Sequence, residues 1–492
     1  MTWSIPQILE HYKKSKILES TIGLLEWDQE TYMPTQSVNI RSEQLSYLYG
    51  EHFKIQTHPE FVSSVLKAHS PNPREQKILS KLRIEVAKKT ALDENFVHKI
   101  TISKVKTLEA WKVARSESNF SKVQEALSEI VSLKREEALR LSEHKLLKEH
   151  FNGCTLYEIM LDEYEPGMKA QQLRTLLSQL VEGTKLRLEK IIDKQKSQSW
   201  KSIAYPMPKA EQRELSLKII KQLDFPMERG RLDESHHPFC GGNPEDVRMT
   251  TRYDESDFLN ALFSSIHETG HGIYEASFPR DLIGTPCASG ASTGVHESQS
   301  RFYENFIGRS QAFCDYLGQL TGKNSKELFE SLNLVEKSLI RVDADEVTYN
   351  LHIALRMKIE ESLIEGKIEV KDIPDVWNST FKDYFGIQVP NDTKGCLQDI
   401  HWHGGSFGYF PGYSIGNLLA AEIHADFSKQ FPDWEDKVRN GSFAFIKDYL
   451  YKKVHHFAAL DNSTGTIKNI LPDRDLGAEA FLKYLDNKYL NH

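Results

Sequence analysis

The chain has 492 residues, a formal net charge of −8, and charged residues of both signs along its length. This composition suits a globular protein with a sizeable core and gives no basic patch for nucleic acid. No apolar run approaches the 18 residues that a membrane span requires, so we expect no membrane partner.

The N-terminus runs directly into an amphipathic segment, without the apolar core of a signal peptide. The five cysteines are scattered, odd in number and without a C-x-x-C pair. Both features predict reduced thiols and a cytoplasmic location.

The first half of the chain has the periodicity of helices. Ser121 and Gln124 form an S-x-x-Q capping box, which predicts a helix that begins there. Leucines and isoleucines at helical spacing predict a second helix over 173–192. Pro-Gly at 166–167 and the prolines of 206–208 predict breaks between elements.

No linker rich in Pro, Gly or Ser, no repeat and no low-complexity block interrupts the sequence. We therefore expect one domain over residues 1–492, mainly α-helical, with two lobes around a deep cleft. A β-branched and aromatic stretch at 247–253 predicts a short strand, and so a small β-sheet beside the cleft. We expect an edge strand, which can pair with an extended peptide.

The helix that follows contains the most informative motif, His267-Glu268-Thr269-Gly270-His271. Two histidines four residues apart project from one helix face and can share a metal ion. Zinc, or alternatively cobalt, suits imidazole nitrogens, and a catalytic zinc binds three protein ligands and a water. Glu268 can accept a proton from that water, whose pKa zinc lowers to about 7. The motif predicts a hydrolase with one metal ion per chain.

The residues around this motif favour a buried helix. Ser256 or Asp257 can cap its start, and apolar residues recur at helical spacing from Leu259 to Ile266. Gly270 costs such a helix about 1 kcal/mol relative to alanine. A glycine here predicts that another segment approaches closely.

A third ligand must come from later in the chain. The metzincin pattern requires glycine and histidine three and six residues after the second histidine, where this chain has Tyr274 and Ser277. A glutamate on a following helix is the other common solution, and Glu297 lies 26 residues beyond His271 (297 − 271).

Glu297 has two polar neighbours that could also belong to the site. Glu304 is the competing carboxylate, which we expect either beside the ligands or at the surface. His296 is expected to be structural or to face substrate, because a helix turns it about 100° away from Glu297.

The chain resembles the M32 metallocarboxypeptidases, the carboxypeptidase Taq type, over nearly its whole length. Besides the metal motif, the resemblance rests on segments in the right order, namely 24–34 (LLEWDQETYMP), 237–239 (H-P-F), 246–250 (D-x-R-x-T), 296–299 (H-E-S-Q), 340–345 (I-R-x-x-A-D) and 395–402 (G-x-x-Q-D-x-H-W). It implies a large, mainly helical, neurolysin-like metallopeptidase that is usually a homodimer. It also implies metal ligands at His267, His271 and Glu297, with Glu268 as the catalytic carboxylate.

The segment 401–413 is similar to one in neurolysin-type peptidases, where a histidine and a tyrosine twelve residues later assist catalysis. His401 and Tyr413 have that spacing (413 − 401 = 12), and Tyr409 is the rival phenol. Such groups donate hydrogen bonds to the oxyanion of a tetrahedral intermediate. The alternative for His401 and His403 is a second metal site, for which no further ligands occur nearby.

A carboxypeptidase must also bind the terminal carboxylate of its substrate. A guanidinium does so with two parallel hydrogen bonds, and Arg248 and Arg341 lie within the motifs that carry the resemblance. The sequence does not choose between them, and His237 is also expected to contact substrate. Carboxylates in the same motifs are expected to hold these arginines or the metal histidines: Asp246, Asp343, Asp345 and Asp399.

We therefore expect a metal-dependent carboxypeptidase of broad specificity that releases C-terminal amino acids from peptides. An endopeptidase or a dipeptidyl carboxypeptidase on a similar helical scaffold is one alternative. A helical interaction protein with a degenerate site is another, against which the intact motif weighs. His455 and His456, near the C-terminus, are expected at the surface.

Overall fold

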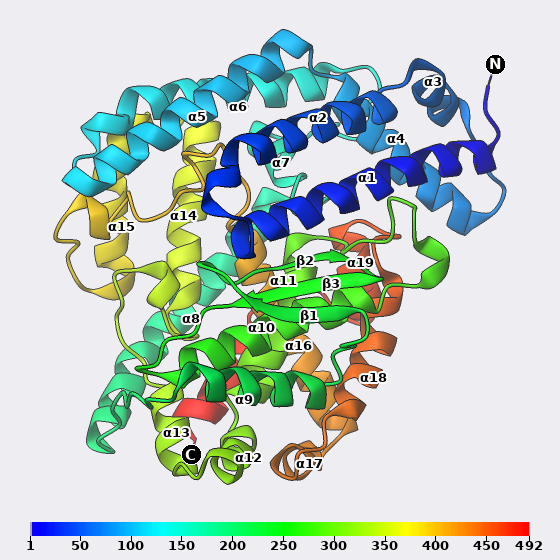
Figure 1. Cartoon of the computed structure of the whole chain (residues 1–492). Helices are drawn as coiled ribbons and strands as arrows, with labels where there is room; N and C mark the ends of the chain where they lie inside the picture. The colour runs from blue at the N-terminus through cyan, green and yellow to red at the C-terminus, as the bar shows by residue number, and fades with distance from the viewer. Residues whose placement is uncertain (1, 492) are drawn as a thin grey trace.

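The computed structural model describes residues 2–491 and consists mainly of helices (Figure 1). Nine helices precede the strands: α1 (Ile5–Thr31), α2 (Val38–Gln56), α3 (Pro59–Lys67), α4 (Pro73–Thr90), α5 (Glu94–Glu117), α6 (Ser121–Glu143), α7 (Leu156–Leu161), α8 (Ala170–Ser197) and α9 (Lys209–Gln222). Within these described residues, no helix is both long and apolar enough to cross a membrane.

Three strands and eleven further helices follow. The strands are β1 (Gly230–Glu234), β2 (Cys240–Asn243) and β3 (Asp246–Thr251). The helices are α10 (Phe258–Ala276), α11 (Thr293–Arg301), α12 (Gln311–Thr321), α13 (Ser325–Leu332), α14 (Tyr349–Ile364), α15 (Ile373–Phe385), α16 (Pro411–Gln430), α17 (Trp434–Arg439), α18 (Ala444–Lys453), α19 (Ser463–Ile470) and α20 (Glu479–Leu485). The predicted class, mainly α with a small sheet, is confirmed.

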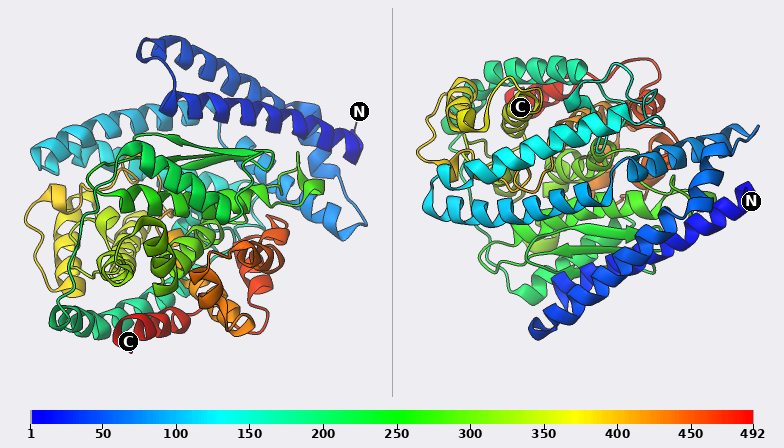
Figure 2. Two further views of the ribbon diagram at one scale, coloured as in Figure 1. Left: turned by 60° about the horizontal axis from the view of Figure 1, so that its bottom comes forward. Right: turned by 90° about the horizontal axis from the view of Figure 1, so that it is seen from above.

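The N-terminal helices form a layer on one side of the molecule. α1 packs along α2, and α5 packs along α6. Figure 2 shows the blue pair α1–α2 on the side of the molecule opposite the C-terminus. α6 begins at Ser121 as predicted, but its capping box is wrong: Ser121 caps nothing and instead donates its hydroxyl to Asn119 Oδ1, 2.7 Å away.

The small sheet lies between this layer and the helices α9 and α10 (Figure 1). Its order is β1-β3-β2, with β1 parallel and β2 antiparallel to β3. The strand predicted at 247–253 therefore exists, but the expected edge position is wrong, because β3 is paired on both sides. Both of its backbone edges are used, so β3 has none free for a peptide.

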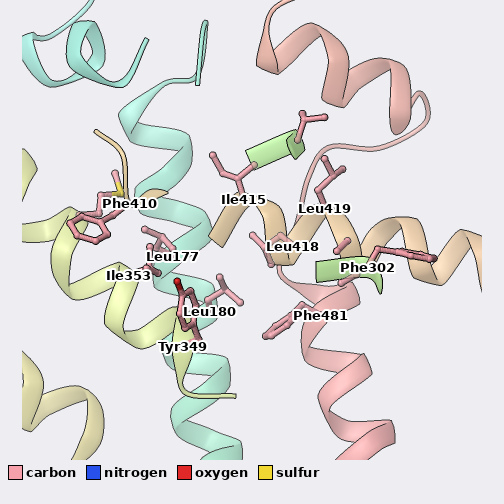
Figure 3. Packing of buried hydrophobic residues seen from close by; sticks show 14 of the residues in the cluster. Leu177, Leu180, Phe302, Tyr349, Ile353, Phe410, Ile415, Leu418, Leu419 and Phe481 are labelled. Carbon is pink, nitrogen blue, oxygen red and sulfur yellow. The ribbon is translucent and has the colours of Figure 1, made fainter. Parts of the chain in front are cut away.

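The hydrophobic core is built around α8, α14, α16 and α20 (Figure 3). Leu177 and Leu180 on α8 face Tyr349 and Ile353 on α14, as the periodicity of 173–192 predicts. α16 is buried along most of its length and packs against both α11 and α14. This packing gives the segments of the site a rigid base.

Candidate metal centre

Helix α10 carries both motif histidines. Asp257 caps its start by accepting a hydrogen bond from the backbone N–H of Leu259 at 3.1 Å, as expected of a capping aspartate. Its apolar stripe is buried up to Ile266. His267 and His271 follow on one face, with ring centroids 4.9 Å apart.

Helix α11 brings Glu297 to these histidines. Glu297 Oε2 lies 3.7 Å from His267 Nε2 and 3.4 Å from His271 Nε2. The three ligand atoms all lie within 4.8 Å of one another. Within residues 2–491, no other group of three or more His, Cys, Asp or Glu side chains is placed to hold a metal ion. Two imidazole nitrogens and a carboxylate oxygen, with room for a fourth ligand, are the donor set of a catalytic zinc site.

Two glycines allow the helices of the site to meet. A Cβ at Gly270 of α10 would lie 2.5 Å from the carbonyl oxygen of Gln299 on α11. A Cβ at Gly416 of α16 would lie 2.7 Å from Cβ of Glu297. The close approach expected at Gly270 is thus the contact between α10 and α11, the two helices that carry the three potential ligands.

Gly270→Ala is therefore expected to lower the free energy of unfolding by about 1–3 kcal/mol, because overpacking outweighs the gain of about 1 kcal/mol in helix propensity. Urea unfolding measures this change. Gly23→Ala in α1 is the matched control, since nothing lies within 4 Å of its Cβ, and it should stabilise the protein slightly. Equal stability of the two variants would show that the contact at Gly270 is not tight.

Glu304 orients a histidine and lies outside the ligand set. Its Oε2 is 2.8 Å from His267 Nδ1, on the far side of the ring from Glu297. It lies in a π-helical turn, Phe302–Gly308, and Arg309 holds its other oxygen at 3.0 Å. A carboxylate on the second nitrogen of a ligand histidine fixes the ring and its tautomer. π-Helical turns frequently occur at functional sites.

His271 has an equivalent support. His296 Nδ1 lies 2.6 Å from His271 Nδ1, and His296 Nε2 lies 2.7 Å from Glu275 Oε1. His296 supports His271 and also lines the cavity, so both roles expected for it, structural and substrate-facing, stay open. Glu275 was not predicted, although it lies one helical turn beyond His271 (275 − 271 = 4) and that spacing is a usable signal.

Burial and neighbouring charges set the protonation of the site. Burial opposes ionisation of Glu297, but the charges of Arg301 and His267 outweigh it and hold the pKa well below its usual range. Burial, with a contribution from His296, lowers the pKa of His271 to about 3. An ionised carboxylate and a neutral imidazole are the forms that bind metals. Burial raises the pKa of Glu268 to about 7, which suits a group that exchanges protons near neutral pH.

These residues border a cavity of about 1330 Å³. Its wall contains Glu268, the three potential ligands and both predicted phenols, Tyr409 and Tyr413. Pro238 and Phe239 of the H-P-F segment also line it, whereas His237 is exposed and lies outside the lining. The edge strand β2 takes part through Cys240, so the sheet borders the cavity through β2 instead of β3.

His401 packs against Tyr409 and lies outside the cavity lining. Its ring centroid is 5.2 Å from that of Tyr409, and burial lowers its pKa to about 4. His403 is buried, with Nδ1 3.1 Å from the carbonyl oxygen of Asp399, and neither histidine joins a group that could hold a second metal in the described part of the chain. The catalytic roles of His401, Tyr409 and Tyr413 stay predictions.

The two predicted carboxylate-binding arginines have different surroundings. Arg341 is buried, bonds Asp399 Oδ1 at 2.9 Å, and lies with Cζ 5.3 Å from the ring centroid of Tyr413. Arg248 bonds Asp246 at 2.9 Å and lies over Trp27 of α1. Neither lines the cavity, but Arg341 lies over the ring of Tyr413, which does.

Two further expectations have clear outcomes. Asp246 and Asp399 hold arginines, as expected. Asp345 instead accepts hydrogen bonds from the backbone N–H groups of Val347 and Thr348, just before α14. The expected surface position of His455 is wrong, because the side chain is fully buried. Its Nε2 lies 3.0 Å from Gln299 Oε1 of α11.

Comparison with known proteins agrees with this geometry. The family model described as carboxypeptidase Taq (M32) metallopeptidase matches residues 7–489. Carboxypeptidase 1 of Bacillus subtilis is 34% identical over 98% of this chain and 96% of its own, and thermostable carboxypeptidase 1 of Pyrococcus furiosus is 34% identical over 99% and 98%. The solved structure of Trypanosoma cruzi metallocarboxypeptidase 1 covers 99% of each chain at 30% identity, with a TM-score of 0.94.

Proposed function

Because the chain belongs to the carboxypeptidase Taq (M32) family and is a metallocarboxypeptidase, we propose that it releases single C-terminal amino acids from peptides, with broad specificity. The proposed ligands of one zinc ion, or alternatively cobalt, are His267, His271 and Glu297. The observation that supports this assignment is the convergence of their three ligand atoms on one point of a long cavity.

A zinc ion bound there would polarise the scissile carbonyl and lower the pKa of water to about 7. Glu268 accepts a proton from the attacking water and delivers it to the nitrogen of the leaving amino acid. Its burial beside the proposed ligands supports this role, because a carboxyl group with a pKa of about 7 can both accept and return a proton.

Tyr413, or its neighbour Tyr409, donates a hydrogen bond to the oxyanion, and His401, packed against Tyr409, supports the pair. Arg341 is the better placed of the two arginines for the terminal carboxylate, because it lies over the ring of Tyr413. Arg248 and His237 then contact more distant parts of the substrate. We further propose that residues 1–492 form one peptidase domain with two lobes around the cavity, located in the cytoplasm.

Digestion of an N-acetylated peptide, followed by mass spectrometry, tests the function. Successive loss of single C-terminal residues is expected, and the same peptide with a C-terminal amide should be cleaved far more slowly because it lacks the terminal charge. Loss of dipeptides would indicate a dipeptidyl carboxypeptidase, and internal fragments an endopeptidase; either result would refute the proposal.

We also propose a homodimer. Large apolar side chains are exposed along α1, α2 and the turn between them, the most exposed being Tyr47 at 68%, and patches of this kind commonly mark protein interfaces. The others are Ile17, Leu24, Tyr32, Val38, Ile40, Tyr49 and Phe53. Light scattering should give twice the chain mass for the wild type and the single mass for Tyr47→Glu with Phe53→Glu; a monomeric wild type would refute the dimer.

A further inference from the structure

The cavity that contains the metal centre is also lined by four lysines. All of them lie on α4, and the cavity extends from there to His267 and Glu268. Three have polar partners: Lys77 with Asp461 at 2.7 Å, Lys88 with Asp162 at 2.8 Å, and Lys89 with Gln56. Lys81 Nζ has no carboxylate oxygen within 4.0 Å in residues 2–491, and its own hydrogen-bond partners are uncharged.

Lys81 lines the same cavity as His267, Glu268 and His271. Its Nζ lies 3.5 Å from Ser289 Oγ and 3.5 Å from the carbonyl oxygen of Ala459, both at the limit of a hydrogen bond. Ser289 precedes Gly290, where a Cβ would lie 3.0 Å from Cδ2 of His296. His296 in turn contacts His271. The ammonium group therefore lies beside the segment from Ser289 to His296, which borders the same cavity as the proposed metal site.

Glu85, one turn along α4, makes no ion pair with Lys81 within 4.0 Å in the described residues. Glu85 Oε2 accepts a hydrogen bond from Tyr12 at 2.9 Å, and burial raises the pKa of Glu85, which disfavours its charged form. Burial also lowers the pKa of Lys81. A half-buried ammonium group whose hydrogen-bond partners are all uncharged would be stabilised by an anionic ligand.

We propose that Lys81 forms an anion-binding subsite for an aspartate or glutamate side chain of the peptide, upstream of the scissile bond. This inference rests on the proposed function, because a carboxypeptidase places one residue beyond the scissile bond and must accommodate the rest along the long cavity. Lys77 and Lys88 are paired with carboxylates, and Lys89 is exposed and bonded to Gln56, so we expect the half-buried Lys81 to set the preference.

Pairs of N-acetylated peptides that differ only by glutamate or glutamine at the first, second or third residue before the scissile bond test the subsite. The wild type should prefer glutamate in kcat/KM by about five- to tenfold at one or more of these positions. Lys81→Met should abolish the preference and Lys81→Arg should retain it. Lys218→Met, exposed on α9, changes the net charge equally and should leave the preference intact.

Equal preferences in the wild type and Lys81→Met would overturn the proposal. So would an equal loss of kcat/KM for every peptide together with lost discrimination against the C-terminal amide, because Lys81 would then bind the terminal carboxylate.

Calorimetric binding of the same peptides to metal-free protein separates this inference from the proposed function. A glutamate preference that depends on Lys81, without any release of single residues, would support the subsite and refute the carboxypeptidase assignment. Release of single residues without a Lys81-dependent preference in either measurement would do the opposite.

Discussion

Glu268→Gln is expected to lower kcat by roughly 10²–10⁴ while the protein keeps its metal. The amide has nearly the same size and can occupy the same buried position, but it cannot accept a proton from water at neutral pH. Glu268 also lies next to the proposed ligands without being one of them, so metal binding should not depend on its charge.

Peptide turnover and elemental analysis of the same preparation check this result. Glu327→Gln, an exposed glutamate on α13, removes an equal charge and should be fully active. Turnover of Glu268→Gln at the wild-type rate would exclude this residue as the base. Loss of metal would instead indicate that Glu268 helps to bind the ion.

Glu297→Gln is expected to abolish stable metal binding and, with it, activity. Glutamine removes the negative charge from the proposed ligand set. It retains the side-chain volume and an oxygen that can accept the 2.7 Å hydrogen bond from Arg301. The variant should therefore fold, whereas Glu297→Ala would also leave Arg301 without that partner.

Metal content after dialysis, with the circular dichroism spectrum as a check of folding, measures this effect. Glu304→Gln is the graded comparison, because it keeps all three proposed ligands and alters the group that orients His267. We expect it to weaken metal binding by about 10- to 100-fold without abolishing it. A folded Glu297→Gln with full metal occupancy would contradict the ligand assignment.

Local patterns predicted the helices well, because helical periodicity and the spacing of the two histidines are properties of neighbouring residues. α10 and α8 are the clearest cases. The position of β3 in the sheet was not predictable in this way. Its partner β2 reads Cys240-Gly241-Gly242-Asn243, without the alternation that identifies a strand.

The parts of the site that depend on distant segments were the hardest to predict. Glu297 follows from its motif, and Glu275 could have been found by its spacing from His271. The choice between Arg248 and Arg341 depends on which carboxylates and rings the fold brings to each. His455 was placed wrongly because its partner Gln299 is 156 residues away in sequence.

Diffraction from crystals grown with zinc, recorded at the zinc absorption edge, tests the central claim most directly. The account predicts one anomalous peak per chain, bound by Nε2 of His267, Nε2 of His271 and a carboxylate oxygen of Glu297. An empty pocket, or a peak bound by other side chains with Glu297 turned away, would contradict it.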